Sequence, residues 1–322
     1  MLVHLRITVP TDMTDDVRRL LLAERCVTNL VVLEGVVVEP EGDLLEVDVA
    51  REETGALLSQ LDDAGVTERG GVVVVRPSAA PFARARELEA EAPGHPDDAV
   101  IWESVAAAAD DGSVPTVSYL VFLVLAVVLA AIAVVTDSSV LVVGAMVVGP
   151  EFSAVAAASV GVVLGRWATV GRSLALLALS FTFAVVVVVL LALLARATGL
   201  LTADLVTRPR PNTGFIWHPD IWSFIVALVA GTAGALALAI EKTATMVGVF
   251  ISVTTVPAAG NLALGLAVWD RGEILGSLAQ LGANVAGMVI AGTLLLGFMR
   301  LWWPRVMRLS ERVLPQRPAA RR

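Results

Sequence analysis

Several residue types are scarce in this chain, and each scarcity excludes a class of site. Among 322 residues there is one cysteine, Cys26, and there are three histidines. A single cysteine excludes an intrachain disulfide and a metal cage built from cysteines. No Walker sequence, histidine-rich metal pattern or nucleophile elbow occurs either. We therefore expect that the protein is not an enzyme, and we expect no cofactor and no metal.

Basic residues are scarce in the first third of the chain. Residues 1–116 carry 23 acidic and 9 basic side chains, whereas residues 117–322 carry 8 acidic and 14 basic ones. An acidic aqueous part therefore precedes a mildly basic part. A surface this acidic argues against nucleic acid as a partner. The alternating, then charged N-terminus also lacks the pattern of a signal peptide.

Apolar residues are abundant instead, at 57% of the chain, with a mean hydropathy of +0.79. They gather in segments of about 20 residues, the length of a helix that crosses a bilayer. The predicted spans are residues 117–136, 140–164, 173–195, 221–240, 246–268 and 274–301. The distribution of basic residues in the short loops predicts that both termini are cytoplasmic. Residues 117–303 then form the membrane domain and residues 304–322 a basic cytosolic tail.

Residues 1–77 have the pattern of a small soluble domain. Alternation, turn residues and helical spacing predict strand, helix, strand, strand, helix and strand in that order. This order is that of a ferredoxin-like α+β domain. Such a domain could serve oligomerisation and packing, or could sense a ligand. Residues 78–116 are expected to form a linker with surface helices.

The membrane domain contains a candidate internal repeat. Asp137 and Glu241 are 104 residues apart, as are Gly144 and Gly248, and Gly161 and Gly265. Each unit holds three spans, and because three is odd the second unit enters the bilayer from the opposite side. The prediction is two inverted three-helix repeats, a plan of many secondary transporters. The alternative is two unrelated helices that contain proline.

Glu151 lies in the middle of the predicted span 140–164. A charge at that depth costs several kcal/mol. Gly149 and Pro150 precede it and are expected to break the helix, which makes Pro150 the start of a half-helix. A second break is predicted at Pro257. The candidate substrate- or ion-binding residues are Gly149, Pro150, Glu151, Thr254, Thr255, Pro257, Asn261 and Asn284. The alternative is that Glu151 is structural and is bonded to backbone, Asn261 or Asn284.

Three stretches of the membrane domain carry a family resemblance. They are Asp137 to Gly165 with Gly149-Pro-Glu-Phe, Val249 to Asn261, and Asn284-Val-Ala-Gly-Met288. Residues 117–299 resemble the bacterial membrane family catalogued as domain of unknown function 389. The resemblance implies a multi-pass protein of the bacterial cytoplasmic (inner) membrane. It carries no settled activity and therefore no site residues.

Two functions fit these patterns. The first is a membrane transporter or channel for a small polar or ionic solute, with Glu151 as a contact for a proton or cation. The second is a membrane-anchored sensor or scaffold whose cytosolic domain binds a ligand or partner. The expected partners are the lipid bilayer, the solute and further copies of the chain. A homo-oligomer is expected because the first and third spans lack charges and could face a neighbour.

Overall fold

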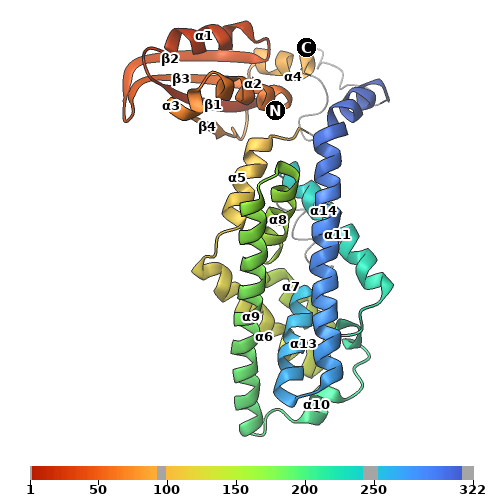
Figure 1. The fold of residues 1–322 in the computed structure, drawn as a ribbon. Coiled ribbons are helices and arrows are strands. Elements are labelled where there is room, and N and C mark those ends of the chain that lie inside the picture. Colours follow the sequence, from red (N-terminus) through yellow and green to blue (C-terminus); the bar gives the residue numbers. More distant parts are fainter. Residues whose placement is uncertain (1, 93–98, 242–252, 314–322) are drawn as a thin grey trace. The chain divides into compact units, whose positions relative to one another are not determined.

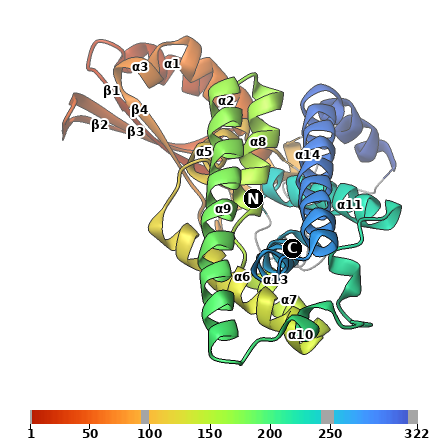
Figure 2. The same ribbon diagram turned by 60° about the horizontal axis from the view of Figure 1, so that its bottom comes forward.

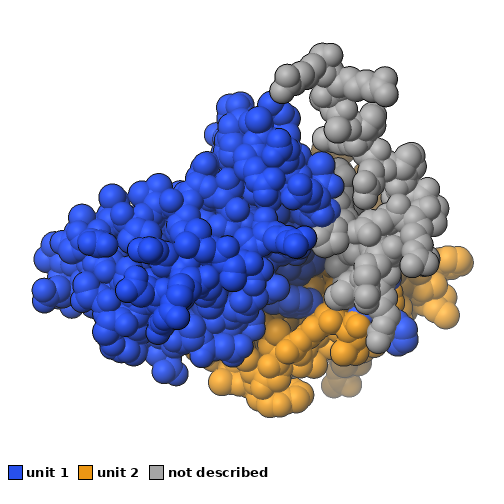
Figure 3. Space-filling model, turned by 90° about the horizontal axis from the view of Figure 1, so that it is seen from above, with its two compact units in different colours: residues 1–103, 302–322 blue, residues 104–301 orange. Residues whose placement is uncertain are grey.

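The computed structural model describes residues 2–92, 99–241 and 253–313. The chain divides into two compact units, coloured in Figure 3. The first, called the N-terminal unit here, is residues 1–103 with 302–322, and the second, called the membrane unit, is residues 104–301. The division falls within the predicted linker 78–116. Each unit is described by itself.

The N-terminal unit is built on a four-stranded antiparallel sheet with the strand order β2-β3-β1-β4 (Figure 1). Its strands are β1 (Leu2–Val9), β2 (Val27–Val38), β3 (Glu41–Ala50) and β4 (Gly71–Val75). Its helices are α1 (Thr14–Ala23), α2 (Arg51–Asp63), α3 (Val66–Arg69) and α4 (Ala83–Glu91). The order β1-α1-β2-β3-α2-α3-β4 adds only the short α3 to the order predicted from the sequence.

The core of this unit follows from the two-residue period of its strands. Leu5 and Ile7 point to one face of β1 and are fully buried, because side chains alternate across a strand. They pack in one cluster with Leu21 of α1 and with Leu57 and Leu61 of α2. The helices therefore cover one face of the sheet.

The membrane unit is helical (Figures 1 and 2). Its long helices are α6 (Val117–Thr136), α9 (Trp167–Ala197), α11 (Ile221–Ala239) and α14 (Arg271–Val313), of which α14 continues beyond this unit. Its shorter helices are α5 (Trp102–Gly112), α7 (Ser139–Val148), α8 (Phe152–Leu164), α10 (Ala203–Thr207), η2 (Gly214–Ile216) and α13 (Thr255–Val268).

Four of these helices are long and apolar enough to cross a membrane: α6, α9, α11 and the Arg271–Trp302 part of α14. The pair α7 and α8 is bent by 54° at its break and makes a fifth span if it is counted as one. These helices indicate a multi-pass membrane protein. The fifth predicted span, 246–268, is represented by the shorter α13, and its beginning lies outside the described residues.

Small residues let the central helices approach closely. A Cβ at Gly260 of α13 would lie 2.7 Å from the Ala130 side chain of α6 and 2.8 Å from the Ala131 nitrogen. Glycine at a helix contact removes that clash, as is common between membrane helices. Large apolar side chains on α9 point outward instead, namely Leu179, Phe183, Val186, Leu190 and Leu194. Their spacing places them along one face of α9, as a lipid-facing helix requires.

Helix ends recur at a spacing of 104 residues. Thr116 caps α6 by accepting a hydrogen bond from Tyr119 nitrogen, and Asp220 caps α11 by accepting one from Ser223 nitrogen. Both are polar residues that satisfy a free amide at a helix start. Gly165 and Trp269 end α8 and α13, each in the left-handed conformation.

Candidate functional site

The predicted break at Gly149 and Pro150 is present. Helix α7 ends at Val148 and α8 begins at Phe152, with Pro150 between them. Proline has no amide hydrogen and clashes with the preceding turn, which explains why α7 stops there. A Cβ at Gly149 would run into the Glu151 carboxylate and would lie 2.7 Å from Val256 Cγ2. The junction therefore accommodates glycine, which has no Cβ, and no larger residue.

Glu151 is buried at the junction, with 8% of its surface exposed. Its Oε1 accepts a hydrogen bond of 2.7 Å from the Thr255 hydroxyl at the start of α13. Its Oε2 is buried and has no hydrogen-bond partner among the residues that the structure describes. The structural alternative from the sequence had the side chain of Glu151 bonded to backbone, Asn261 or Asn284, but the hydrogen-bond donor is Thr255. One carboxylate oxygen thus remains available at the meeting point of two helix starts.

The junction lies midway between the two ends of α9. Helices α8 and α13 have 13 and 14 residues, so each is about 20 Å long. From the junction, α8 runs to the N-terminal end of α9. Helix α13 runs to the other end, where Arg196 of α9 donates to the Ala267 carbonyl. With 31 residues, α9 spans about 46 Å.

A second polar group surrounds Thr254, the residue before α13. Its hydroxyl accepts bonds of 2.9 Å from both Gln280 Nε2 and Asn284 Nδ2 of α14. The Gln280 and Asn284 side chains lie 3.4 Å apart and are buried. Gln280 Oε1 has no partner among the described residues. This group thus places two predicted residues, Thr254 and Asn284, next to the junction, together with a second unpaired acceptor.

A third polar group joins α13 to the start of α14. The Arg210 guanidinium donates to Asn261 Oδ1 at 2.7 Å and forms a buried ion pair with Glu273. Asn261 Nδ2 donates to Glu273 Oε2 at 2.6 Å and to the Ser277 hydroxyl at 2.8 Å. All four side chains are buried. Asn261 therefore belongs to this group and not to the Glu151 junction.

Pro257 occupies the third position of α13 and is buried. The first amides of a helix have no partner within the helix, so a proline there removes no helical hydrogen bond. The helix thus begins just before the predicted break residue. No other role is visible for this proline.

The sequence prediction missed Arg210, Glu273, Ser277 and Gln280. A signal was present: Glu273, Ser277, Gln280 and Asn284 follow one another at intervals of four, three and four residues, the spacing of one helix face. On an otherwise apolar helix, such a polar face indicates a buried polar contact. No group of three or more His, Cys, Asp or Glu side chains that could hold a metal occurs in the described part of the chain.

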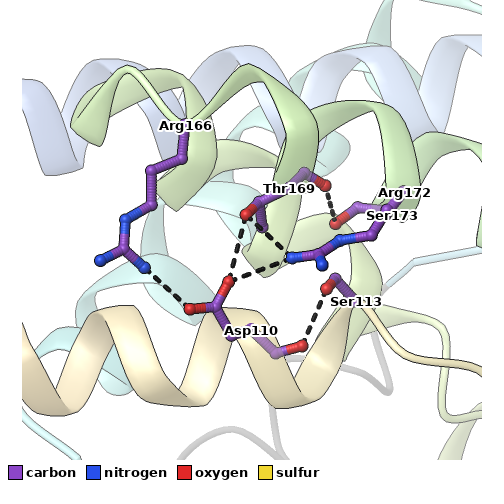
Figure 4. Close-up of polar contacts among 6 residues, drawn as sticks. All are labelled: Asp110, Ser113, Arg166, Thr169, Arg172 and Ser173. Carbon is purple, nitrogen blue, oxygen red and sulfur yellow. Dashed lines mark hydrogen bonds and ion pairs between the residues drawn. The ribbon is translucent and has the colours of Figure 1, made fainter.

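Asp110 of α5 forms a further polar group at the start of α9 (Figure 4). Its carboxylate accepts from Arg166 at 2.8 Å, from the Thr169 hydroxyl at 3.1 Å and from Arg172 at 3.3 Å. Helix α5 ends against α8, because a Cβ at Gly112 would lie 2.9 Å from the Ser153 carbonyl oxygen. The end of helix α5 therefore contacts Ser153, which follows Glu151 by two residues in the chain.

A pocket of about 490 Å³ opens at the Arg210 end of the unit. It is lined by Thr207, Arg208, Pro209, Arg210, Pro211, Gly214, Trp217, His218 and Glu273. The Trp217 and His218 rings are in contact, with 3.7 Å between centroids and a tilt of 35° between their planes. The buried ion pair of Arg210 and Glu273 thus forms part of the pocket wall.

Together, the apolar helices and the polar groups between them define a multi-pass membrane protein with a buried polar interior. Residues 146–290 match the family model described as Domain of unknown function (DUF389). The resemblance noted in the sequence is confirmed over these residues, which lie within the membrane unit. No curated protein and no solved structure matches the chain.

Proposed function

We propose that this protein is a membrane transporter or channel for a small polar or ionic solute, and that Glu151 takes up a proton or cation on its path. The observation that carries the proposal is Glu151 Oε2, a buried carboxylate oxygen without a partner among the described residues. An unpaired carboxylate is costly away from water. Inside membrane segments such residues usually mark ion, proton or substrate pathways. The junction of two helix starts is also a typical site in transporters.

The proposal includes two inverted three-helix repeats and six spans, with α13 as the described part of the fifth predicted crossing. Equivalent contacts support it. Arg166 nitrogen donates to the Gly161 carbonyl at 2.8 Å, and 104 residues later Asp270 nitrogen donates to Gly265 at 3.0 Å. A Cβ at Gly161 would meet Val170, just as one at Gly265 would meet Ile274.

The remaining expectations concern the surroundings of the membrane unit. The strand order β2-β3-β1-β4 and the element order support a ferredoxin-like domain. We place both termini in the cytoplasm of a bacterium, with the spans in its inner membrane. The outward apolar face of α9 supports contact with lipid or with a second copy of the chain. Nothing in this proposal calls for nucleic acid or a cofactor.

Purified protein in liposomes tests the proposal. We expect uptake of protons, sodium or rubidium ions under an imposed membrane potential, followed with a pH-sensitive dye or radioactive tracer. Glu151→Gln keeps the size of the side chain and removes its charge, so the flux should fall about a hundredfold or more, as expected when a positioned proton-transfer group is lost. Asp204→Asn on the exposed face of α10 is the matched control and should conduct normally. Flux that is unchanged in Glu151→Gln would show that the carboxylate is structural.

A sensor or scaffold is the second candidate. A pocket of about 230 Å³ in the N-terminal unit favours it, lined by Arg25, Cys26, Ala50, Glu53, Leu88, Glu91 and Ala92. Deletion of residues 1–77 separates the two candidates. Transport by the membrane unit predicts that flux persists, whereas a sensor that acts through its soluble domain predicts complete loss of function.

A further inference from the structure

Two polar groups of the membrane unit occupy equivalent positions in the proposed repeats. We call Asp110, Arg166, Thr169 and Arg172 the Asp110 clamp, and Arg210, Asn261, Glu273 and Ser277 the Arg210 clamp. Thr169 and Glu273 are 104 residues apart, near the starts of α9 and α14. Each is bonded by a charged residue that lies shortly before the first long helix of its repeat, Asp110 before α6 and Arg210 before α11. The two clamps therefore tie corresponding helices.

The clamps lie on opposite sides of the Glu151 junction and at equal distances from it. Thr169 is next to Val170, which packs on Gly161, ten residues along α8 from Glu151. On the other side Glu273 packs on Gly265, ten residues along α13 from Thr255. Ten residues of helix measure about 15 Å.

The clamps differ in their exposure to solvent. The Arg210 and Glu273 side chains are 2% and 5% exposed, whereas those of Arg166 and Asp110 are 48% and 44% exposed. Both clamps are bonded, but the Arg210 clamp is shut off from solvent, whereas the side chains of the Asp110 clamp are about half exposed. A buried ion pair has lost hydration that it regains on opening, which offsets part of the cost of separating its two charges.

We propose that the Arg210 clamp and the Asp110 clamp are the two gates of the path to Glu151 and that they open alternately. This inference rests on the proposed transport function. Opening the Arg210 clamp joins the pocket of about 490 Å³ to the face of α14 that carries Ser277, Gln280 and Asn284. Opening the Asp110 clamp frees α5 from α9 and uncovers the first turn of α8. The structure has the Arg210 gate shut.

Thiol labelling from each side of the membrane tests the gates without measuring transport. The full chain carries Cys26→Ser, so that Thr254→Cys at the junction is the single thiol. A membrane-impermeant thiol reagent is added to spheroplasts or to inside-out vesicles. Glu273→Gln should raise the labelling rate from one face and Asp110→Asn from the opposite face, each about tenfold, a usual size for coupling between sites. Asp12→Asn, which breaks the exposed ion pair with Arg69 in the N-terminal unit, should change neither rate.

Ser277→Ala removes one bond of its clamp, and Thr169→Val removes two, the bond to Asp110 and the bond from Arg172. Both variants keep the charged residues and should shift labelling in the same directions by a smaller factor. These milder variants keep the test decisive if a charge variant fails to fold. If labelling rises from the same face in both clamp variants, or stays unchanged in folded protein, the proposal that the clamps are gates is wrong. If labelling shifts as expected but Glu151→Gln conducts normally, the clamps are gates but Glu151 is not a contact for the transported ion.

Discussion

The Thr255 hydroxyl donates a hydrogen bond to the Glu151 carboxylate, and the two residues are 104 positions apart in the chain. That separation is the period at which helix caps and glycine contacts also recur. Residues that are related by a two-fold axis and touch each other must lie beside that axis. The contact thus supports placing the proposed symmetry axis through the site.

Thr255→Val tests the importance of this bond. The change removes the donor to Oε1 and leaves a buried carboxylate with neither oxygen bonded by a side chain that the structure describes. Loss of a partner to a buried polar group costs about 1–3 kcal/mol. We expect thermal unfolding in detergent at a clearly lower temperature. Thr182→Val on the exposed face of α9 is the control and should be nearly neutral, and in a Glu151→Leu background Thr255→Val should cost much less.

Gly149→Ala probes the space at the break. Its added methyl group would collide with the Glu151 carboxylate and Val256, neither of which is the loose end of a surface side chain. Overpacking of this kind costs about 1–3 kcal/mol. The melting temperature in detergent should fall accordingly. Gly171→Ala in α9, where a methyl group meets no atom within 4 Å, should keep or raise it; equal effects at the two sites would contradict the geometry.

The Arg210 and Glu273 pair should show strong coupling in a double-mutant cycle. Arg210→Met alone leaves a buried carboxylate without its cation, which costs about 3–5 kcal/mol. Glu273→Leu alone leaves a buried guanidinium with the same penalty. The double variant should recover much of the stability, because two apolar side chains replace two charges. Additive losses in chemical unfolding would show that the pair is not a closed unit.

Cys26 should be an unreactive thiol. Burial, assisted by the neighbouring Glu53 carboxylate, raises the pKa of Cys26 from 9.0 to about 12. Since the thiolate is the reactive form, its reaction with a disulfide reagent at pH 8 should be roughly a thousandfold slower than that of an unfolded cysteine. The folded state holds the proton longer, so this group's contribution to stability is complete below pH 9 and is lost as the pH rises toward 12. Rapid reaction in native protein would contradict the burial.

The sequence predicted the elements that depend on local pattern. Alternation in residues 3–9 predicted β1, and the long apolar run over 117–136 predicted α6 to the residue. The position of Glu151 at the break also followed, because Gly149 and Pro150 act through their own backbone. These features require no knowledge of distant neighbours.

The partners of the site residues could not be predicted in the same way. Nothing in the local sequence marks Arg210 as buried, because a charge between apolar segments is ordinarily solvated. Yet α14 begins three residues before the predicted span and brings Glu273 inside. The Asp270 side chain accepts from the Glu273 amide and fixes that early start. The burial of the pair follows from the fold of residues 63 positions apart, which no local window contains.

The length of α9 has a consequence for the setting of the protein. About 46 Å of helix exceeds a hydrocarbon layer of about 30 Å. In a bilayer, the phosphate layers of the two leaflets would fall near Arg166 and Arg172 at one end of α9 and near Arg196 at the other. Lipids of different chain length would move those layers along the helix. The thickness of the host bilayer would thereby determine which residues at the two ends of α9 lie at the membrane surface.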